Sequence, residues 1–269
     1  MTFLATTPIL AAESDGFHAP SIDDFFPPAI WFDGTWFEIN RITLVRFVAL
    51  IALLLVFGIA AKRATLVPGR FQAAIEWILD FCRYSITYDT LGEKDGKKYV
   101  PLITAIFCSV FFFNITGVIP FLNIAGTSVI GLPLIFALWA YVMYFGAGIK
   151  KLGLGKFLKV NLLPAGVPKG LYLLLTPIEF LQLVIIRPAT LMIRLLANMM
   201  AGHLLLALCF AGTQYLLFSA EGGLKVFGVV TFAGGFAFFL LEIFVAALQA
   251  YVFAILTALY IQMSSAEEH

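Results

Sequence analysis

The chain has 269 residues, of which 61% are hydrophobic and 12% are charged, whereas a soluble domain has roughly 45–50% apolar and 25% charged residues. This composition excludes a water-soluble globule, and the 28 phenylalanines exclude a disordered polar chain. The net charge of +1 gives no overall field that would favour nucleic acid. The sequence therefore predicts an all-α integral membrane protein, with a single membrane domain over residues 1–269.

The N-terminal segment, residues 1–41, carries six acidic residues and Arg41 as its one Lys or Arg. The following segment, 42–61, contains a single charge, Arg46, and ends before Lys62 and Arg63. About 20 apolar residues cross a hydrocarbon core, so 42–61 is the first predicted membrane helix.

The next segment, residues 70–90, differs from a membrane span. Apolar side chains such as Ile75, Ile78 and Cys82 recur with the 3.6-residue period, and polar side chains such as Glu76 and Asp80 lie between them. This pattern predicts an amphipathic helix lying at the membrane interface. A helix that binds a partner protein is the alternative.

Residues 99–149 contain no Asp, Glu, Lys or Arg, but Gly117, Pro120, Asn123 and Gly126 interrupt the stretch. Glycine and proline mark turns. We therefore expect two membrane helices, over 101–120 and 129–149.

The stretch 171–218 contains 48 residues, which as one helix would extend about 72 Å, more than twice the thickness of the hydrocarbon core. It is either two spans or one long tilted helix, and Pro177 and Pro188 are positions where a helix kinks. A last membrane helix is predicted over 225–262, where Glu242 is the one charge besides Lys225.

Basic residues set the expected orientation, because cytoplasmic loops are rich in Lys and Arg. Two connections, 62–98 and 150–169, hold most of them. Both connections, and the amphipathic helix in the first of them, should therefore be cytoplasmic. The N-terminus is then outside and the C-terminus inside.

Several polar and charged side chains occur within the last two apolar regions. A charge at membrane depth costs at least about 2.5–3.5 kcal/mol, so each one requires a partner or a function. The cluster consists of Glu179, Arg187, Arg194, His203 and Glu242, accompanied by Asn198 and Gln249.

Arg194 is central to this cluster because a guanidinium group keeps its proton in proteins. At 100° per residue, Arg187, Thr190, Asn198 and Ala201 lie within about 40° of Arg194, and this face is polar and small. His203 lies on the opposite side of the helix, about 13.5 Å further along. A structural ion pair within the membrane is the alternative role for Arg194.

The sequence gives little support for a haem-carrying respiratory subunit or for a nucleotide-hydrolysing enzyme. Bis-His haem ligation needs two membrane-embedded histidines, and His18 and His269 lie outside the apolar regions. The nucleotide-binding pattern GxxxxGK[ST] is absent. We therefore expect no cofactor and no resident metal, and no ATP hydrolysis by this chain.

One segment carries a specific resemblance. The sequence RPATLMIRLLANMMAGHLLLAL resembles the penultimate helix of subunit a of the bacterial F-type ATP synthase membrane sector (F0), and LEIFVAALQAYVFAILTALYI resembles its last helix. FFFNITGVIPF is similar to an earlier span of that family. The resemblance covers most of the chain from about residue 100 onward.

This resemblance implies a stator subunit that provides two proton half-channels to a rotating c-subunit ring, so that proton flow is coupled to ring rotation and ATP synthesis. Peripheral-stalk b subunits and the rest of the F1F0 complex are the further implied partners, and the implied location is the plasma or inner membrane of a bacterium. It also implies that 171–218 forms one steeply tilted helix. The implied roles are Arg194 facing the ring carboxylate, His203, Glu242 and Asn114 on the outer pathway, Asn198 and Gln249 beside the passage, and Glu179 on the cytoplasmic pathway.

The sequence departs from the family in two ways. Where many members have Glu after Ala-Gly, this chain has His203, and where they have His seven residues before the glutamine, it has Glu242. The exchange preserves one acid and one imidazole if the two helices pack as a hairpin. Gly117 replaces an Asp of some members, which puts any proton-relay role there in doubt.

An independent secondary transporter or ion channel is the competing class, because intramembrane charges also bind solutes. A haem-free, quinone-linked respiratory subunit is a third. The choice between H⁺ and Na⁺ stays open, although protons are favoured.

Overall fold

The computed structural model describes residues 28, 30–31, 39–119, 122, 124–162, 171–219 and 223–265. Almost all of these residues are helical, and their one β-type contact is an isolated bridge between Trp31 and Ile39. Four of the described helices are long and apolar enough to cross a membrane, and Val100–Ile115 is a shorter apolar helix. The predicted all-α membrane class is therefore confirmed. Most of the expected extracytoplasmic segment, together with His18 and His269, lies outside the described residues.

Helix α1 spans Arg41–Lys62 and begins at a side-chain cap, because the Asn40 side chain accepts a hydrogen bond from the Thr43 N–H at 3.0 Å. Arg46, the charge inside this helix, bonds to the loop that follows α5. Its Nε donates to the Gly126 carbonyl at 2.8 Å and its Nη2 to the Val129 carbonyl at 3.3 Å. These two hydrogen bonds stabilise the half-buried guanidinium group. They explain how an arginine is accommodated within an apolar helix.

The predicted amphipathic segment forms one helical run. It consists of α2 (Arg70–Asp80), the π-helical η2 (Phe81–Tyr88) and α3 (Asp89–Leu91), and it ends at Gly92, whose φ of 75° favours glycine. The short α4 spans Glu93–Gly96. Ile75, Cys82 and Ile86 are buried, while Trp77 is exposed. The run is amphipathic, and its position at the membrane surface remains a prediction.

Helix α5 spans Val100–Ile115 and ends five residues before the expected position. The reason is a chain reversal, in which the Phe113 carbonyl accepts hydrogen bonds from the Gly126 N–H at 3.0 Å and the Thr116 hydroxyl at 2.8 Å. In a continuing α-helix the Phe113 carbonyl would accept from the Gly117 N–H, but that N–H bonds to Asn114 instead. Helix α5 therefore ends before residue 120. Helix α6 follows over Gly131–Leu152 and ends at Gly153, and α7 spans Leu154–Leu162.

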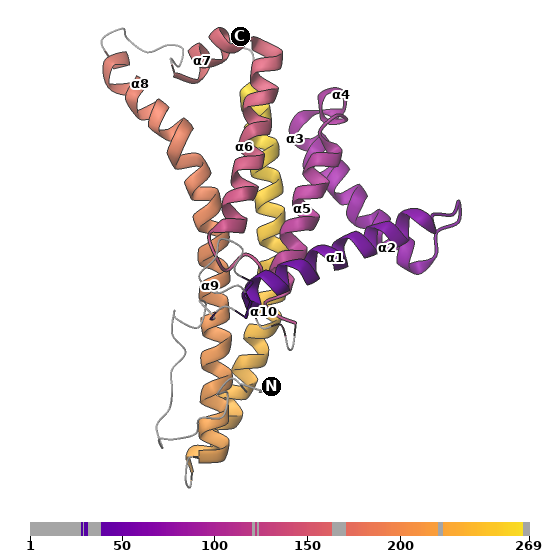
Figure 1. The fold of residues 1–269 in the computed structure, drawn as a ribbon, viewed down its shortest axis with the longest axis vertical. Coiled ribbons are helices and arrows are strands. Elements are labelled where there is room, and N and C mark those ends of the chain that lie inside the picture. Colours follow the sequence, from indigo (N-terminus) through magenta and orange to yellow (C-terminus); the bar gives the residue numbers. More distant parts are fainter. Residues whose placement is uncertain are drawn as a thin grey trace.

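The long stretch after residue 170 is a single helical segment rather than two spans. It runs over Tyr172–Ser219 as α8 (Tyr172–Leu181), η4 (Gln182–Ile186), α9 (Arg187–Gln214) and η5 (Tyr215–Ser219). Helix α10, Leu224–Ser265, then returns antiparallel to α9. Figure 1 shows α8 bending away from the line of α9.

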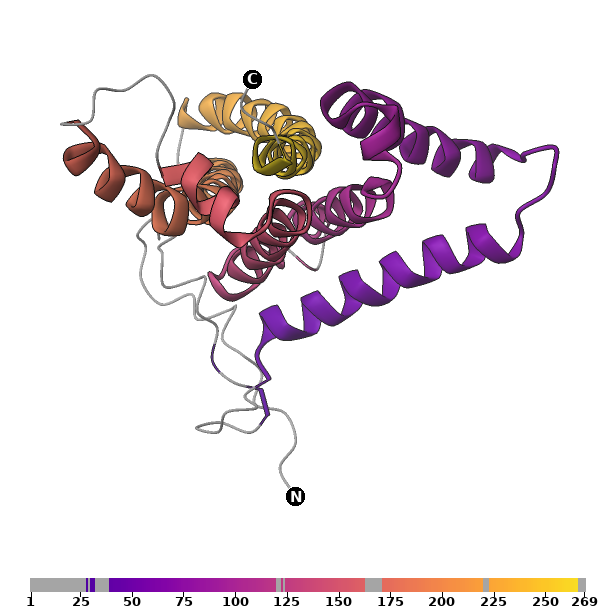
Figure 2. The ribbon, with the colours of Figure 1, turned by 90° about the horizontal axis from the view of Figure 1, so that it is seen from above.

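Helix α10 is the centre of the packing and contacts α5, α6 and α9. In Figures 1 and 2, α5 and α6 flank one half of the α9–α10 hairpin, and the other half extends beyond them. The core of this bundle contains Ile106, Phe136, Leu195 and Phe253. One end of the hairpin is therefore held from several sides, and the other end by its own two helices.

Helix α1 crosses the hairpin at a large angle (Figure 1). Its 22 residues extend about 33 Å, which matches a hydrocarbon core of about 30 Å when the helix stands upright. Two helices at a large angle cannot both stand upright in one bilayer. The tilt of the longer hairpin stays a prediction from its length.

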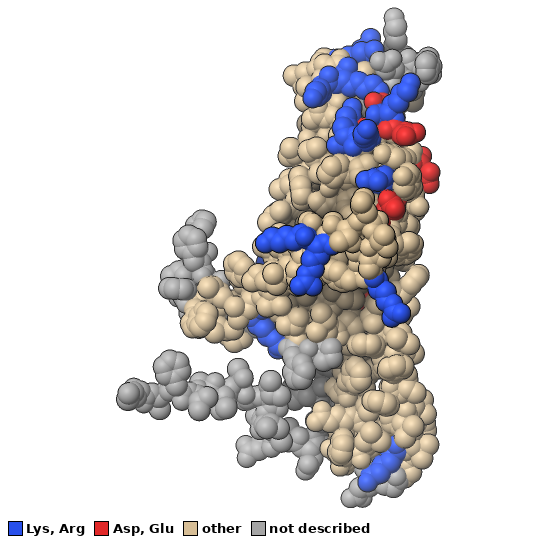
Figure 3. Space-filling view, turned by 90° about the vertical axis from the view of Figure 1, so that its right-hand side faces the viewer, with Lys and Arg blue, Asp and Glu red and all other residues tan. Residues whose placement is uncertain are grey.

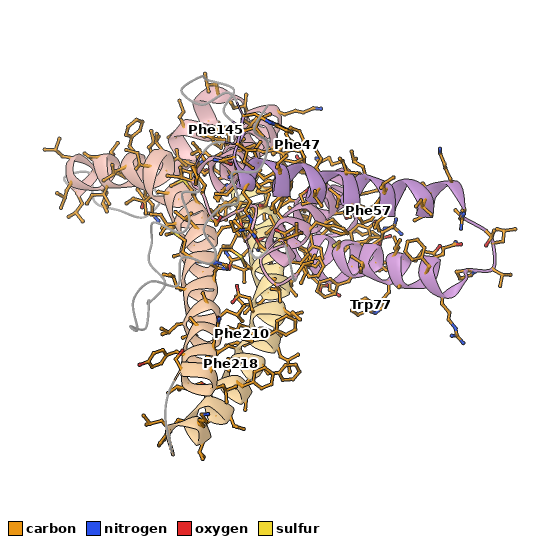
Figure 4. All side chains as sticks on the ribbon, turned by 60° about the horizontal axis from the view of Figure 1, so that its bottom comes forward. Phe47, Phe57, Trp77, Phe145, Phe210 and Phe218 are labelled. Atoms are coloured by element: carbon orange, nitrogen blue, oxygen red, sulfur yellow. The ribbon has the colours of Figure 1, made fainter. Side chains whose placement is uncertain are left out.

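The arms formed by α1 and α2 diverge from the bundle, and Figure 4 shows Phe57 on one arm and Trp77 on the other. An apolar cavity of about 480 Å³ lies between these arms, α5 and α10. Phe111 and Tyr251 line its inner side. Helix α1 therefore touches the bundle mainly through its first half, where Ile42, Val45 and Ala49 are buried.

Charged side chains are unevenly distributed over the face shown in Figure 3. Lys and Arg lie at the upper end and in a second group at mid-height, and the surface of the lower half of the hairpin is largely uncharged. Asp95 links two elements at the charged end, because it pairs with Lys98 at 3.8 Å and with Lys151 at 3.5 Å. Both predicted cytoplasmic connections therefore meet there, although the side of the membrane remains a prediction.

Candidate functional site

The polar side chains of α10 face α9. Glu242 and Gln249 are seven residues apart on α10 and are 8% and 3% exposed. The Glu242 carboxyl packs against Gly202 so closely that a Cβ atom at position 202 would overlap it. Gly202 directly precedes the half-buried His203. The hairpin thus brings Glu242 to the level of Gly202 and His203, while the shared role of the acid and the imidazole stays a prediction.

A second polar contact joins the two helices, four residues from Gly202 on α9 and seven residues from Glu242 on α10. The Asn198 Nδ2 donates a hydrogen bond to the Gln249 Oε1 at 3.0 Å. The Gln249 Nε2 is buried and has no hydrogen-bond partner among the described residues. This amide donor is therefore available to another polar group.

Arg194 lies on the outer face of α9. Thr190, Ala197, Asn198 and Ala201 are exposed beside it, while Leu191, Leu195 and Met199, on a stripe about 100° around the helix, are buried. Among the described residues Arg194 forms no salt bridge. The alternative of an ion pair within the chain therefore finds no support in the described part of the protein.

Glu179 and His203 lie on opposite sides of Arg194 along the helical segment. Glu179 is half-buried on α8, fifteen residues before Arg194, which corresponds to about 22 Å along a helix. His203 follows Arg194 after nine residues, about 13.5 Å further on. The structure therefore does not bring Glu179 together with the pair His203 and Glu242, and Arg194 lies between them.

Asn114 closes the end of α5 and is fully buried. Its Oδ1 accepts a hydrogen bond from the Thr127 hydroxyl at 2.7 Å, and its Nδ2 has no partner in the described part of the chain. The loop that carries Thr127 packs on the hairpin, because Ala125 contacts Met199 and Ala246. Asn114 thus lies in the layer next to the polar side chains of α10. Sequence analysis did not identify Thr127, since nothing in the sequence pairs a loop threonine with a helix asparagine.

Arg187 lies near tyrosines of α6 and α10, and Arg194 interacts electrostatically with one of them, Tyr260. Arg187 interacts electrostatically with Tyr141, Tyr144 and Tyr260. The spacing of Tyr141 and Tyr144 on one face of α6 is the signal that could have indicated this aromatic environment. Among the described residues, His, Cys, Asp and Glu form no group suited to a metal ion.

Comparison with known proteins gives a consistent family. The family model described as ATP synthase A chain matches residues 43–262. The chain is 44% identical over 265 residues to "ATP synthase subunit a" of Rhodococcus erythropolis, covering 98% of this chain and 96% of the relative. It is 36% identical over 278 residues to the protein of the same name from Nocardioides sp., covering 100% of both chains. A third relative of that name, from Pseudarthrobacter chlorophenolicus, is 35% identical over 94% of both chains.

Proposed function

The chain belongs to the ATP synthase A chain family, the proton-translocating stator subunit of the F0 sector, and from that premise we propose how its residues carry protons. Subunit a is part of the membrane sector rather than a catalytic subunit. The family assignment does not favour an independent transporter or channel. It supports ATP synthesis and proton transport in a multi-pass protein of a bacterial membrane.

The outer half-channel runs from outside the cell past Asn114 to Glu242 and His203. The contact between the Glu242 carboxyl and Gly202 supports this pathway, because Gly202 directly precedes His203 in the chain. Carboxyl and imidazole groups can both bind and release protons. The hydrogen bond between Asn198 and Gln249 borders the passage towards Arg194.

Arg194 faces the carboxylate of each passing c subunit and separates the two half-channels. A guanidinium group favours the ionised form of a nearby carboxylate and does not relay protons itself. The exposure of Arg194 on a face of small residues is the observation that carries this proposal. Small residues let another helix approach closely, as rotation past the ring requires.

The inner half-channel passes Glu179, on the other side of Arg194. A proton that has travelled round on the ring leaves there towards the cytoplasm. Each proton then delivers about 2.3 kcal/mol per 100 mV of membrane potential. Peripheral-stalk b subunits hold the protein against rotation, with the N-terminus outside and the C-terminus in the cytoplasm.

ATP-driven proton pumping in inverted membrane vesicles tests the role of Arg194. We expect Arg194→Ala and Arg194→Lys to abolish pumping, because an ammonium group can release its proton and lacks the planar guanidinium fork. Arg63→Ala, which changes an exposed arginine after α1, is the matched control and should pump normally. Coupled pumping by either Arg194 variant would contradict the proposal.

A further inference from the structure

The bend between α8 and α9 contains a π-helical turn followed by a proline. In η4 the Arg187 N–H donates to the Gln182 carbonyl, five residues earlier. An α-helix would instead join residue 187 to Leu183. In the π pattern the Leu183 carbonyl would accept from residue 188, which is Pro188 and has no N–H. The helix therefore supplies no backbone donor to the Leu183 carbonyl.

This carbonyl lies in a buried position, because Leu183 is 2% exposed. A buried carbonyl without a donor is costly, above all within a membrane. The hydroxyl of Tyr141 on α6 donates a hydrogen bond to it. A side chain from another helix therefore replaces the donor that the proline removes.

The direction of α8 depends strongly on this bend. None of the residues of α8 is buried, and beyond the bend the helix packs mainly against α7. Figure 1 shows α8 leaving the line of α9 at this point. Glu179 lies on α8, three residues before η4 begins. Any change in the bend therefore moves Glu179 relative to Arg194.

We propose that Tyr141 is a positioning residue for the inner half-channel, whose hydroxyl holds the bend at Leu183 and so places Glu179 relative to Arg194. The proposal rests on the proposed function of Glu179 and Arg194. Tyr141 itself carries no proton in this scheme. Its effect on transport is transmitted through the geometry of α8.

A distance measured across the bend tests this proposal in the assembled complex. Spin labels at Leu174→Cys on α8 and Phe210→Cys on α9 (Figure 4), with the three native cysteines replaced by alanine, report the separation of the two arms. A straight helix would separate these positions by about 54 Å. We expect a narrow distribution at a shorter distance, which Tyr141→Phe broadens or shifts.

Tyr144→Phe is the matched control for the spin-label experiment. Tyr144 lies on the same helix, but its hydroxyl donates to the Asn161 Oδ1 at 2.6 Å instead of to Leu183. This variant should therefore leave the distance between the labels unchanged. An unaltered distribution in Tyr141→Phe would overturn the proposal.

A double-mutant cycle with Pro188→Ala gives a second test, because alanine restores an N–H that can bond to Leu183. Tyr141→Phe alone should lower ATP-driven proton pumping several-fold. In the Pro188→Ala background the same change should cause little further loss, since the carbonyl then has a backbone donor. An equal fold loss in both backgrounds would count against the proposal.

Arg194→Ala, measured in parallel, separates this proposal from the proposed function. If Arg194→Ala abolishes pumping and Tyr141→Phe leaves the label distance unchanged, the positioning role fails and the proposed function stands. Coupled pumping by Arg194→Ala would overturn both.

Discussion

The carboxyl group of Glu242 on α10 lies directly against the backbone of Gly202 on α9. A glycine allows this close approach because it has no Cβ atom. The contact occurs one residue before His203, and Glu242 is 8% exposed. It brings Glu242 close to a residue next to His203, which lies 39 positions earlier in the sequence.

Gly202→Ala should disrupt this contact, since its Cβ would occupy the position of the carboxyl. Overpacking of a buried contact costs about 1–3 kcal/mol. We expect Glu242 to be displaced and most ATP-driven proton pumping to be lost. Pumping in inverted vesicles, with the amount of assembled complex measured alongside, checks this.

The control for Gly202→Ala is Gly234→Ala on the same hairpin. A Cβ at position 234 would meet no atom within 4 Å. That variant should assemble and pump normally. Equal pumping by the two variants would show that the close contact has no role in transport.

Exchanging the acid and the imidazole tests whether they act together. His203→Ala and Glu242→Ala should each impair translocation. The double change His203→Glu with Glu242→His should retain part of it, because the hairpin still holds one acid and one imidazole at the same level. Pumping rates for the three variants would reveal the coupling, and a double variant as inactive as each alanine variant would argue against it.

The hydrogen bond between Asn198 and Gln249 can be assigned an energy. A neutral hydrogen bond contributes about 0.5–1.5 kcal/mol. Asn198→Ala, Gln249→Ala and the double variant should therefore be non-additive by this amount in the thermal stability of the purified complex. Strict additivity would mean that the two side chains do not interact in the membrane.

Thr127→Val should leave the buried Asn114 carbonyl oxygen without its donor. A buried group that loses its partner costs about 1–3 kcal/mol. We expect lower thermal stability and slower proton uptake, since the loop after α5 would no longer hold Asn114 in place. Thr65→Val, at an exposed position before α2, is the comparison. A Thr127→Val complex with unchanged stability and uptake would contradict the assigned hydrogen bond.

Much of the fold follows from the sequence because membrane helices obey simple rules of length and polarity. The charge-free stretch after residue 99 indicated two helices, and the apolar segment before Lys62 indicated another. The end of α5 was placed too late, since the signal for termination is a hydrogen bond from Gly126 to Phe113, thirteen residues away. Such a long-range contact leaves no periodic pattern in the chain.

The sequence alone determined the membrane class, the intramembrane charges and the resemblance to a family, because composition, periodicity and a dense local motif are properties of a linear chain. The tertiary structure decided which of these charges meet. It placed Glu242 beside Gly202, left Arg194 on an exposed face and separated Glu179 from both. It also identified Tyr141 as the donor to Leu183, a role that depends on packing between α6 and the bend. Antiparallel packing of α9 and α10 creates these neighbours, and the distances between helices are not encoded in any single segment.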